Sequence, residues 1–125
     1  PYMGMDALKP FLDYADKGVV VLCRTSNKGA KEIQELKLEN GMELYKHVAA
    51  LISGPWNYNG NTMLVAGATF PQELGGVLKY GLTEDKTGLV INSSRGIIYA
   101  SSGSDFAEKA AAACRELKDA INRHR

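Results

Sequence analysis

The sequence has no strong excess of either charge and no long apolar run. Its 15 lysines and arginines against 14 aspartates and glutamates give a formal net charge of +1, so charge does not favour a nucleic-acid partner. No apolar stretch approaches the roughly 20 residues that cross a membrane. With 45% hydrophobic and 23% charged residues among 125, the composition predicts one globular domain with its own core.

Cysteine and histidine are scarce as well. Cys23 and Cys114 are far apart, lie in apolar segments and lack metal-ligand spacing, so we expect two reduced core residues in a cytoplasmic protein. His47 is predicted to be a surface or packing residue in a helix, and His124 lies in the C-terminal tail. No glycine pattern matches a dinucleotide fingerprint or a P-loop.

Apolar runs and amphipathic patterns alternate along the chain. We expect apolar strands over residues 19–23, 63–66 and 89–91. The first is a continuous β-branched run, which is typical of a strand buried on both faces as in parallel sheets. Helical patterns follow Asp6 as far as Gly18, extend over residues 30–36, 42–52 and 77–80, and follow Ser104 to the end, with Asp6 and Ser104 as caps. The alternation of strand and helix predicts an α/β fold with a parallel sheet.

The local pattern fails between Leu74 and Gly75. Residues 71–74 predict the first turn of a helix, with proline at its favoured first position. Gly75 and Gly76 follow at once and should break that helix after a single turn. A helical pattern then resumes at residue 77.

Each predicted strand ends in a polar loop that contains glycine. Such loops share one edge of a parallel sheet, where ligands bind. Here they supply hydroxyls, amides and guanidiniums from Thr25, Ser26, Thr69, Ser93, Ser94, Asn27, Asn92, Arg24 and Arg95. These groups suit a polar, anionic ligand, although residues 92–96 equally fit a polar turn with an exposed arginine. They include no carboxylate–lysine cluster that would supply catalysis.

Four segments resemble the bacterial type 2 branch of orotidine 5′-phosphate decarboxylase. They are PYMG at 1–4, VLCRTSNKG at 21–29, VAGATFP at 65–71 and INSSRGIIYAS at 91–101. The resemblance implies a (β/α)₈ TIM barrel that works as a homodimer. The barrel would convert orotidine monophosphate to uridine monophosphate and CO₂ in pyrimidine biosynthesis, with no metal or organic cofactor. This chain would be the C-terminal part of that domain, about strands five, six and eight over residues 1–125.

The same resemblance implies roles for individual residues. Arg95 would bind the substrate 5′-phosphate, helped by backbone N–H groups around Gly96. Ser26 would contact the pyrimidine ring, with Thr25 and Asn27 as its supporting neighbours. Further substrate contacts are expected from Thr69 and Ser94.

The chain departs from the family pattern in two ways. Nothing in it matches the family's catalytic Asp-x-Lys-x-x-Asp cluster, so we expect the catalytic residues outside this chain and no activity from the chain alone. Roughly two dozen residues, by the length of a barrel unit, are expected to be missing between Leu74 and Gly75. The alternatives are another phosphate-dependent barrel enzyme, or a non-catalytic nucleotide-binding half-barrel that pairs with a copy of itself. None of these hypotheses needs a nucleic acid or a membrane.

Overall fold

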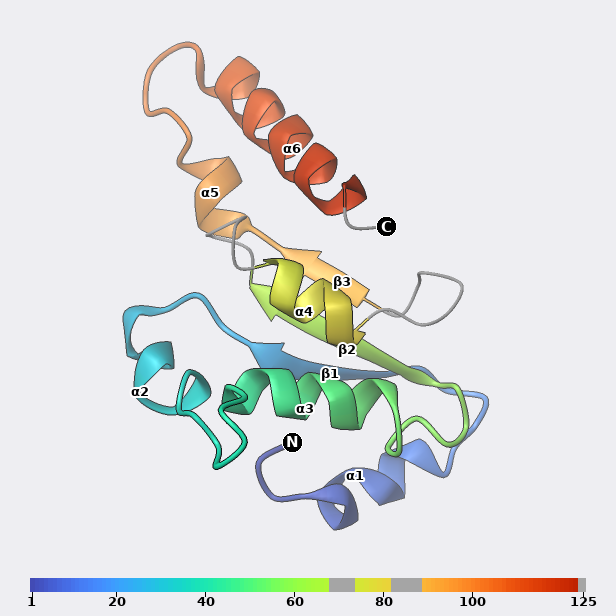
Figure 1. Cartoon of the computed structure of the whole chain (residues 1–125). Coiled ribbons are helices and arrows are strands. Elements are labelled where there is room, and N and C mark those ends of the chain that lie inside the picture. Colours follow the sequence, from blue (N-terminus) through green and yellow to red (C-terminus); the bar gives the residue numbers. More distant parts are fainter. Residues whose placement is uncertain (68–73, 82–88, 124–125) are drawn as a thin grey trace.

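The computed structural model describes residues 1–67, 74–81 and 89–123 (Figure 1). Three parallel strands form one sheet in the order β1–β2–β3, with Val21 of β1 opposite Leu64 of β2, and Leu64 opposite Leu89 of β3. The strands are β1 (Val19–Arg24), β2 (Thr62–Gly67) and β3 (Leu89–Asn92). The predicted α/β fold with a parallel sheet is therefore confirmed.

The helices alternate with the strands along the chain, as expected. They are α1 (Met5–Leu12), η1 (Lys28–Ala30), α2 (Lys31–Gln34), α3 (Leu44–Ser53), α4 (Leu74–Gly81), α5 (Ser94–Ile98) and α6 (Phe106–Asn122). Both predicted caps are wrong: neither α1, which follows Gly4, nor α6, which follows Asp105, has a side-chain cap. Asp6 lies inside the first turn of α1, where its charge still suits the helix N-terminus.

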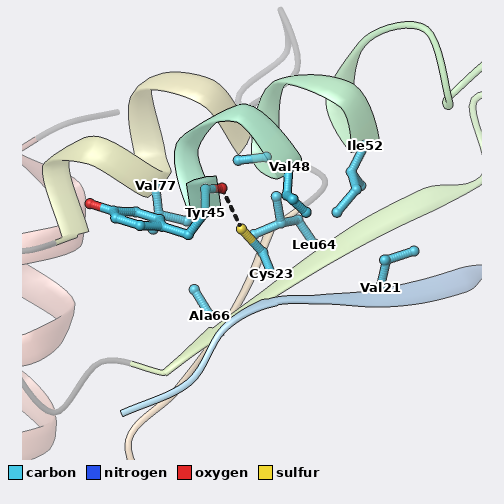
Figure 2. Packing of buried hydrophobic residues seen from close by; sticks show 9 residues of the cluster. Val21, Cys23, Tyr45, Val48, Ile52, Leu64, Ala66 and Val77 are labelled. Atoms are coloured by element: carbon cyan, nitrogen blue, oxygen red, sulfur yellow. Dashed lines mark hydrogen bonds between the residues drawn. The ribbon is translucent and has the colours of Figure 1, made fainter. Parts of the chain in front are cut away.

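Helices α3 and α4 cover one face of the sheet (Figure 1). Figure 2 shows Val48 and Ile52 of α3 on the side of the helix that faces β1 and β2, while the Tyr45 ring extends beside Val77 of α4. The amphipathic stripe predicted for this helix is confirmed, because all four of its residues are buried, namely Tyr45, Val48, Ala49 and Ile52. The core of the described residues thus lies between the sheet and α3.

The opposite face of the sheet is apolar and open. Val20 is 54% exposed, Leu22 49% and Val90 43%, whereas their sequence neighbours face α3 and α4. The expectation that β1 is buried on both faces is therefore wrong for the described residues. Side chains alternate along a strand, and in this part of the chain helices pack on only one side of the sheet.

Helix α4 begins at Leu74 and runs through Gly75 and Gly76, so the expected break is also wrong. A Cβ on Gly76 would lie 3.1 Å from the Tyr45 hydroxyl and 2.8 Å from Cε of Lys46. The glycine lets α4 pack closely against α3. This packing offsets the low helix propensity of glycine.

The two cysteines lie in different surroundings. Cys23 is 1% exposed and donates a hydrogen bond to the Tyr45 carbonyl at 3.1 Å. Cys114 is exposed on α6, so its assignment to the core is wrong. Helix α6 lies beyond the β3 edge of the sheet (Figure 1), where Leu117 and Ile121 pack on Leu78. Neither thiol is in a disulfide, as predicted.

Burial gives Cys23 a pH-dependent role in stability. It raises the pKa of the thiol from an ordinary value of 9.0 to about 12. The thiol's stabilising contribution is therefore complete below about pH 9 and is lost as the pH rises toward 12, because only the unfolded chain ionises readily. Between pH 9 and 11, we expect this thiol to lower the wild-type free energy of unfolding, measured in urea, by about 1.4 kcal/mol per pH unit. Cys23→Ala should lack this part of the pH dependence.

The exposed Cys114 provides the matched control for this measurement. Cys114→Ala should leave the pH dependence of the unfolding free energy unchanged. Equal slopes for wild type and Cys23→Ala would contradict the assignment of this effect to the buried thiol.

Candidate functional site

A cavity of about 270 Å³ opens at the carboxyl ends of the strands. Its walls come from all three strands and from the loop that follows β1, namely Leu22, Arg24, Thr25, Ser26, Val65, Gly67 and Asn92. The structure thus brings together the loops after β1 and β3 that the sequence placed on one face. Thr69 lies outside the described residues.

Arg95 and Ser26 meet beside this cavity although 69 positions separate them in the sequence. Nη2 of Arg95 donates to the Ser26 carbonyl at 3.0 Å and to the Ser26 hydroxyl at 3.1 Å. A guanidinium has no acceptor, so the Ser26 hydroxyl accepts this bond and keeps its own hydrogen for another partner. The side chain of Arg95 is exposed and can reach a ligand in the same region.

The first turn of α5 carries Arg95 and is held by Asn92. Oδ1 of Asn92 accepts hydrogen bonds from the Ser94 amide at 3.2 Å and the Ser94 hydroxyl at 3.0 Å. A Cβ on Gly96 would lie 2.8 Å from the Ser93 hydroxyl. The Ser94 hydrogen bonds therefore stabilise the turn, and the lack of a side chain at Gly96 leaves room for the Ser93 hydroxyl.

A second close approach places Ser26 against the end of β2. A Cβ on Gly67 would lie 3.1 Å from the Ser26 amide nitrogen and 3.2 Å from the Ser26 hydroxyl. Glycine at this position allows the loop after β1 to cross the end of β2. The Ser26 backbone is thereby held within reach of Arg95.

Thr25 and Asn27 flank Ser26 and are bonded to each other. The Thr25 hydroxyl donates to Oδ1 of Asn27 at 2.6 Å. Gln34, the last residue of α2, pairs with Thr25 twice: its Oε1 accepts from the Thr25 amide and its Nε2 donates to the Thr25 hydroxyl, each at 2.9 Å. Sequence analysis missed Gln34, because nothing in a short helix of polar residues distinguishes it.

Arg24 lines the cavity, but its charge, expected to be available to a ligand, is paired with Glu35. It is 6% exposed, and its Nη2 lies 2.8 Å from Oε1 of Glu35. The guanidinium also lies over the Tyr45 ring, 4.4 Å from its centroid. The register of β1 shifts between Leu22 and Arg24, and this bulge buries two successive side chains, Cys23 and Arg24. Glu35 was also missed by the sequence analysis.

The described ranges 1–67, 74–81 and 89–123 contain no group of three or more His, Cys, Asp or Glu residues that could hold a metal ion. Within those same ranges, no helix has the length and apolar character needed to cross a membrane.

No protein-family model matches the chain, but comparison with known proteins finds similarity to orotidine 5′-phosphate decarboxylases. Orotidine 5′-phosphate decarboxylase of Bordetella petrii is 44% identical over 147 residues, an alignment covering 98% of this chain and 54% of the relative. The Aromatoleum aromaticum enzyme is 43% identical, with 100% and 55% covered. The structure of Leishmania donovani OMP decarboxylase matches with a TM-score of 0.65 and 38% identity, over 97% of this chain and 54% of that one. The chain spans about half the length of these relatives.

Proposed function

Because the chain is homologous to about half of orotidine 5′-phosphate decarboxylase, we propose that it forms the phosphate-binding side of such an active site. The reaction is decarboxylation of orotidine 5′-monophosphate to uridine 5′-monophosphate in pyrimidine biosynthesis. The catalytic Asp/Lys cluster lies outside this chain, which is inactive alone. In this proposal β1, β2 and β3 are about strands five, six and eight of a (β/α)₈ barrel.

The contact between Arg95 and Ser26 carries the proposal. Arg95 binds the 5′-phosphate and Ser26 the pyrimidine ring, and their side chains meet at 3.1 Å beside the cavity. Thr25 and Asn27 support Ser26, while Ser94 and Gly96 shape the turn that carries Arg95. Thr69 is assigned to the substrate only by its position after β2.

Binding the phosphate assists a reaction that takes place elsewhere on the substrate. A guanidinium can hold two phosphate oxygens at once, and this binding energy can be used to order the loops over the reacting ring. The chain's contribution is therefore to bind and orient the substrate. The bond-breaking chemistry belongs to the rest of the barrel.

The length of the alignment supports a missing internal segment. The match to the Bordetella petrii enzyme extends over 147 residues, whereas this chain has 125. The relative therefore carries residues within the matched region that this chain lacks. We place the missing segment between Leu74 and Gly75, where α4 now runs across the junction.

The proposal extends to assembly and location. The complete enzyme would bind its nucleotide substrate as a homodimer in the cytoplasm, without a metal or an organic cofactor. The family resemblance supports the assembly and the absence of a cofactor, and the free thiols of Cys23 and Cys114 agree with a reducing compartment.

Titration calorimetry with uridine 5′-monophosphate and with uridine tests the phosphate contact. We expect the monophosphate to bind more tightly than the nucleoside. Arg95→Ala should weaken monophosphate binding by about 1.5–3 kcal/mol, the usual loss for a hydrogen bond to a charged group. Uridine binding should change little, because uridine lacks the phosphate.

The control is Arg115→Ala, which removes another exposed arginine, from α6. It should leave the affinity for both ligands unchanged. Equal affinity of wild type and Arg95→Ala for the monophosphate would show that Arg95 is not the phosphate ligand.

One observation favours a second candidate, a nucleotide-binding half-barrel without turnover. The described residues that line the cavity include no carboxylate, lysine or histidine. This candidate predicts binding of uridine monophosphate with no CO₂ released from orotidine monophosphate, even when the missing barrel strands are supplied. Release of CO₂ by the completed barrel would exclude it.

A further inference from the structure

The guanidinium of Arg95 is already engaged through one of its nitrogens. Both hydrogen bonds that it makes within the described part of the chain leave from Nη2 and end on Ser26, at 3.0 Å to the carbonyl and 3.1 Å to the hydroxyl. Ser26 lines the cavity, whereas Arg95 comes to it from α5. An anion that enters the cavity therefore meets an arginine that is bound to a residue of the cavity wall.

The shape of a guanidinium makes Nη2 the critical atom. An arginine can hold two oxygens at once on either of two forks, one formed by Nε and Nη2 and the other by Nη1 and Nη2. Both forks include Nη2. The Ser26 carbonyl has lone pairs and no hydrogen, so it repels a phosphate oxygen that approaches the same nitrogen. The contact of Arg95 with Ser26 and a two-oxygen contact with phosphate are therefore in competition.

Arg95 is the partner whose side chain has room to move. The Ser26 amide nitrogen lies so close to Gly67 that a Cβ there would be 3.1 Å away. The preceding Thr25 is fixed by the 2.9 Å hydrogen bond from its amide to Gln34. The Arg95 side chain is long and exposed. A rotation of this side chain alone can therefore exchange Ser26 for another acceptor.

We propose that Ser26 is an internal competitor of the phosphate, which binds Arg95 by displacing Ser26 from Nη2. The inference rests on the proposed function, in which Arg95 binds the 5′-phosphate of the substrate. Because substrate and product both carry this phosphate, the competition lowers the affinity for both and favours release of the product. Ser26 thus acts on phosphate binding as well as on the pyrimidine ring.

Ser26→Ala removes the hydroxyl from this competition and leaves the carbonyl. Titration with inorganic phosphate is followed through the Nε–H resonance of Arg95 in NMR spectra, assigned by its loss in Arg95→Ala. We expect the dissociation constant for phosphate to fall about threefold in Ser26→Ala, because one hydrogen bond fewer is broken. A serine that only prepositions Arg95 for the anion would give the opposite sign. An unchanged or larger dissociation constant would overturn the proposal.

Ser102→Ala is the matched control, because it removes an exposed hydroxyl from the loop before α6. It should leave the dissociation constant for phosphate unchanged. A threefold fall in this variant as well would contradict the assignment of the effect to Ser26.

A second measurement uses the wild-type chain and does not depend on how a Ser26 variant folds. The Ser26 carbonyl belongs to the same peptide group as the Asn27 amide, whose resonance therefore reports on the bond from Arg95 to that carbonyl. Phosphate should shift the Asn27 amide and the Arg95 Nε–H with one dissociation constant, and Arg95→Ala should abolish the Asn27 shift. A shift of Arg95 alone would show that Arg95 holds phosphate and Ser26 together, which would overturn the displacement.

The inference and the proposed function fail in different ways. Uridine 5′-monophosphate could bind wild type no more tightly than inorganic phosphate, while Ser26→Ala still strengthens phosphate binding. That result would overturn the proposed function alone, and the competition at Arg95 would stand. Tight binding of the monophosphate that requires Arg95, without any gain in phosphate affinity in Ser26→Ala, would overturn the competition alone.

Discussion

Replacing Glu35 with alanine is expected to lower the free energy of unfolding by about 3 kcal/mol, because it removes the carboxylate that pairs with the buried Arg24 guanidinium. Arg24 is 6% exposed, and its Nη2 lies 2.8 Å from Oε1 of Glu35. The guanidinium also lies 4.4 Å from the centroid of the Tyr45 ring, which attracts its charge. Urea unfolding at fixed protein concentration measures the loss through the fluorescence of Trp56, which packs against the core.

Glu32→Ala is the matched control, because it removes an exposed carboxylate from α2, the helix that ends just before Glu35. It should change the unfolding free energy by less than about 0.5 kcal/mol. Combining Glu35→Ala with Arg24→Met should recover part of the loss, since no buried charge then remains. Equal losses for Glu32→Ala and Glu35→Ala would contradict the buried ion pair.

Leu64→Ala is expected to cost about 2–5 kcal/mol of unfolding free energy, the range for a large-to-small change in a packed core. Leu64 is 1% exposed on the central strand β2 and belongs to the cluster that joins β1, β2, α3 and α4 (Figure 2). The loss combines removed apolar burial with the cavity that remains. The same urea experiment measures it.

Val20→Ala, on the open face of β1, is the control for Leu64→Ala. Val20 is 54% exposed, so its truncation should cost less than about 1 kcal/mol. A cost as large as that of Leu64→Ala would mean that this face is covered in solution.

The periodicity of apolar residues along the sequence predicted those elements that pack directly on the sheet. The stripe of α3 was found because four apolar residues recur with the helical period and face β1 and β2. The end of α1 was not found, because a distant residue determines it. Nδ2 of Asn61 donates to the carbonyls of Leu12, Tyr14 and Lys17 at 3.1, 3.2 and 3.1 Å, so the chain leaves the helix after Leu12.

The candidate site was predictable only in part, for similar reasons. Ser26 and Arg95 could be placed together because both follow parallel strands, whose ends share an edge. The burial of Arg24 could not be foreseen, since it follows from a bulge in β1. Gln34 contacts the site from the last position of α2, and Glu35 contacts Arg24 from the residue that follows this helix. No spacing rule connects that helix to the loop.

The open sheet face carries a consequence for how the stability of this chain should be understood. Val20, Leu22 and Val90 expose apolar surface, and removing this surface from water lowers the free energy. Any body that covers them in the folded state alone, whether further barrel strands or a second copy, stabilises that state by mass action. The free energy of unfolding of this chain therefore depends on the concentration of the polypeptide that covers the open face and on the affinity with which it binds.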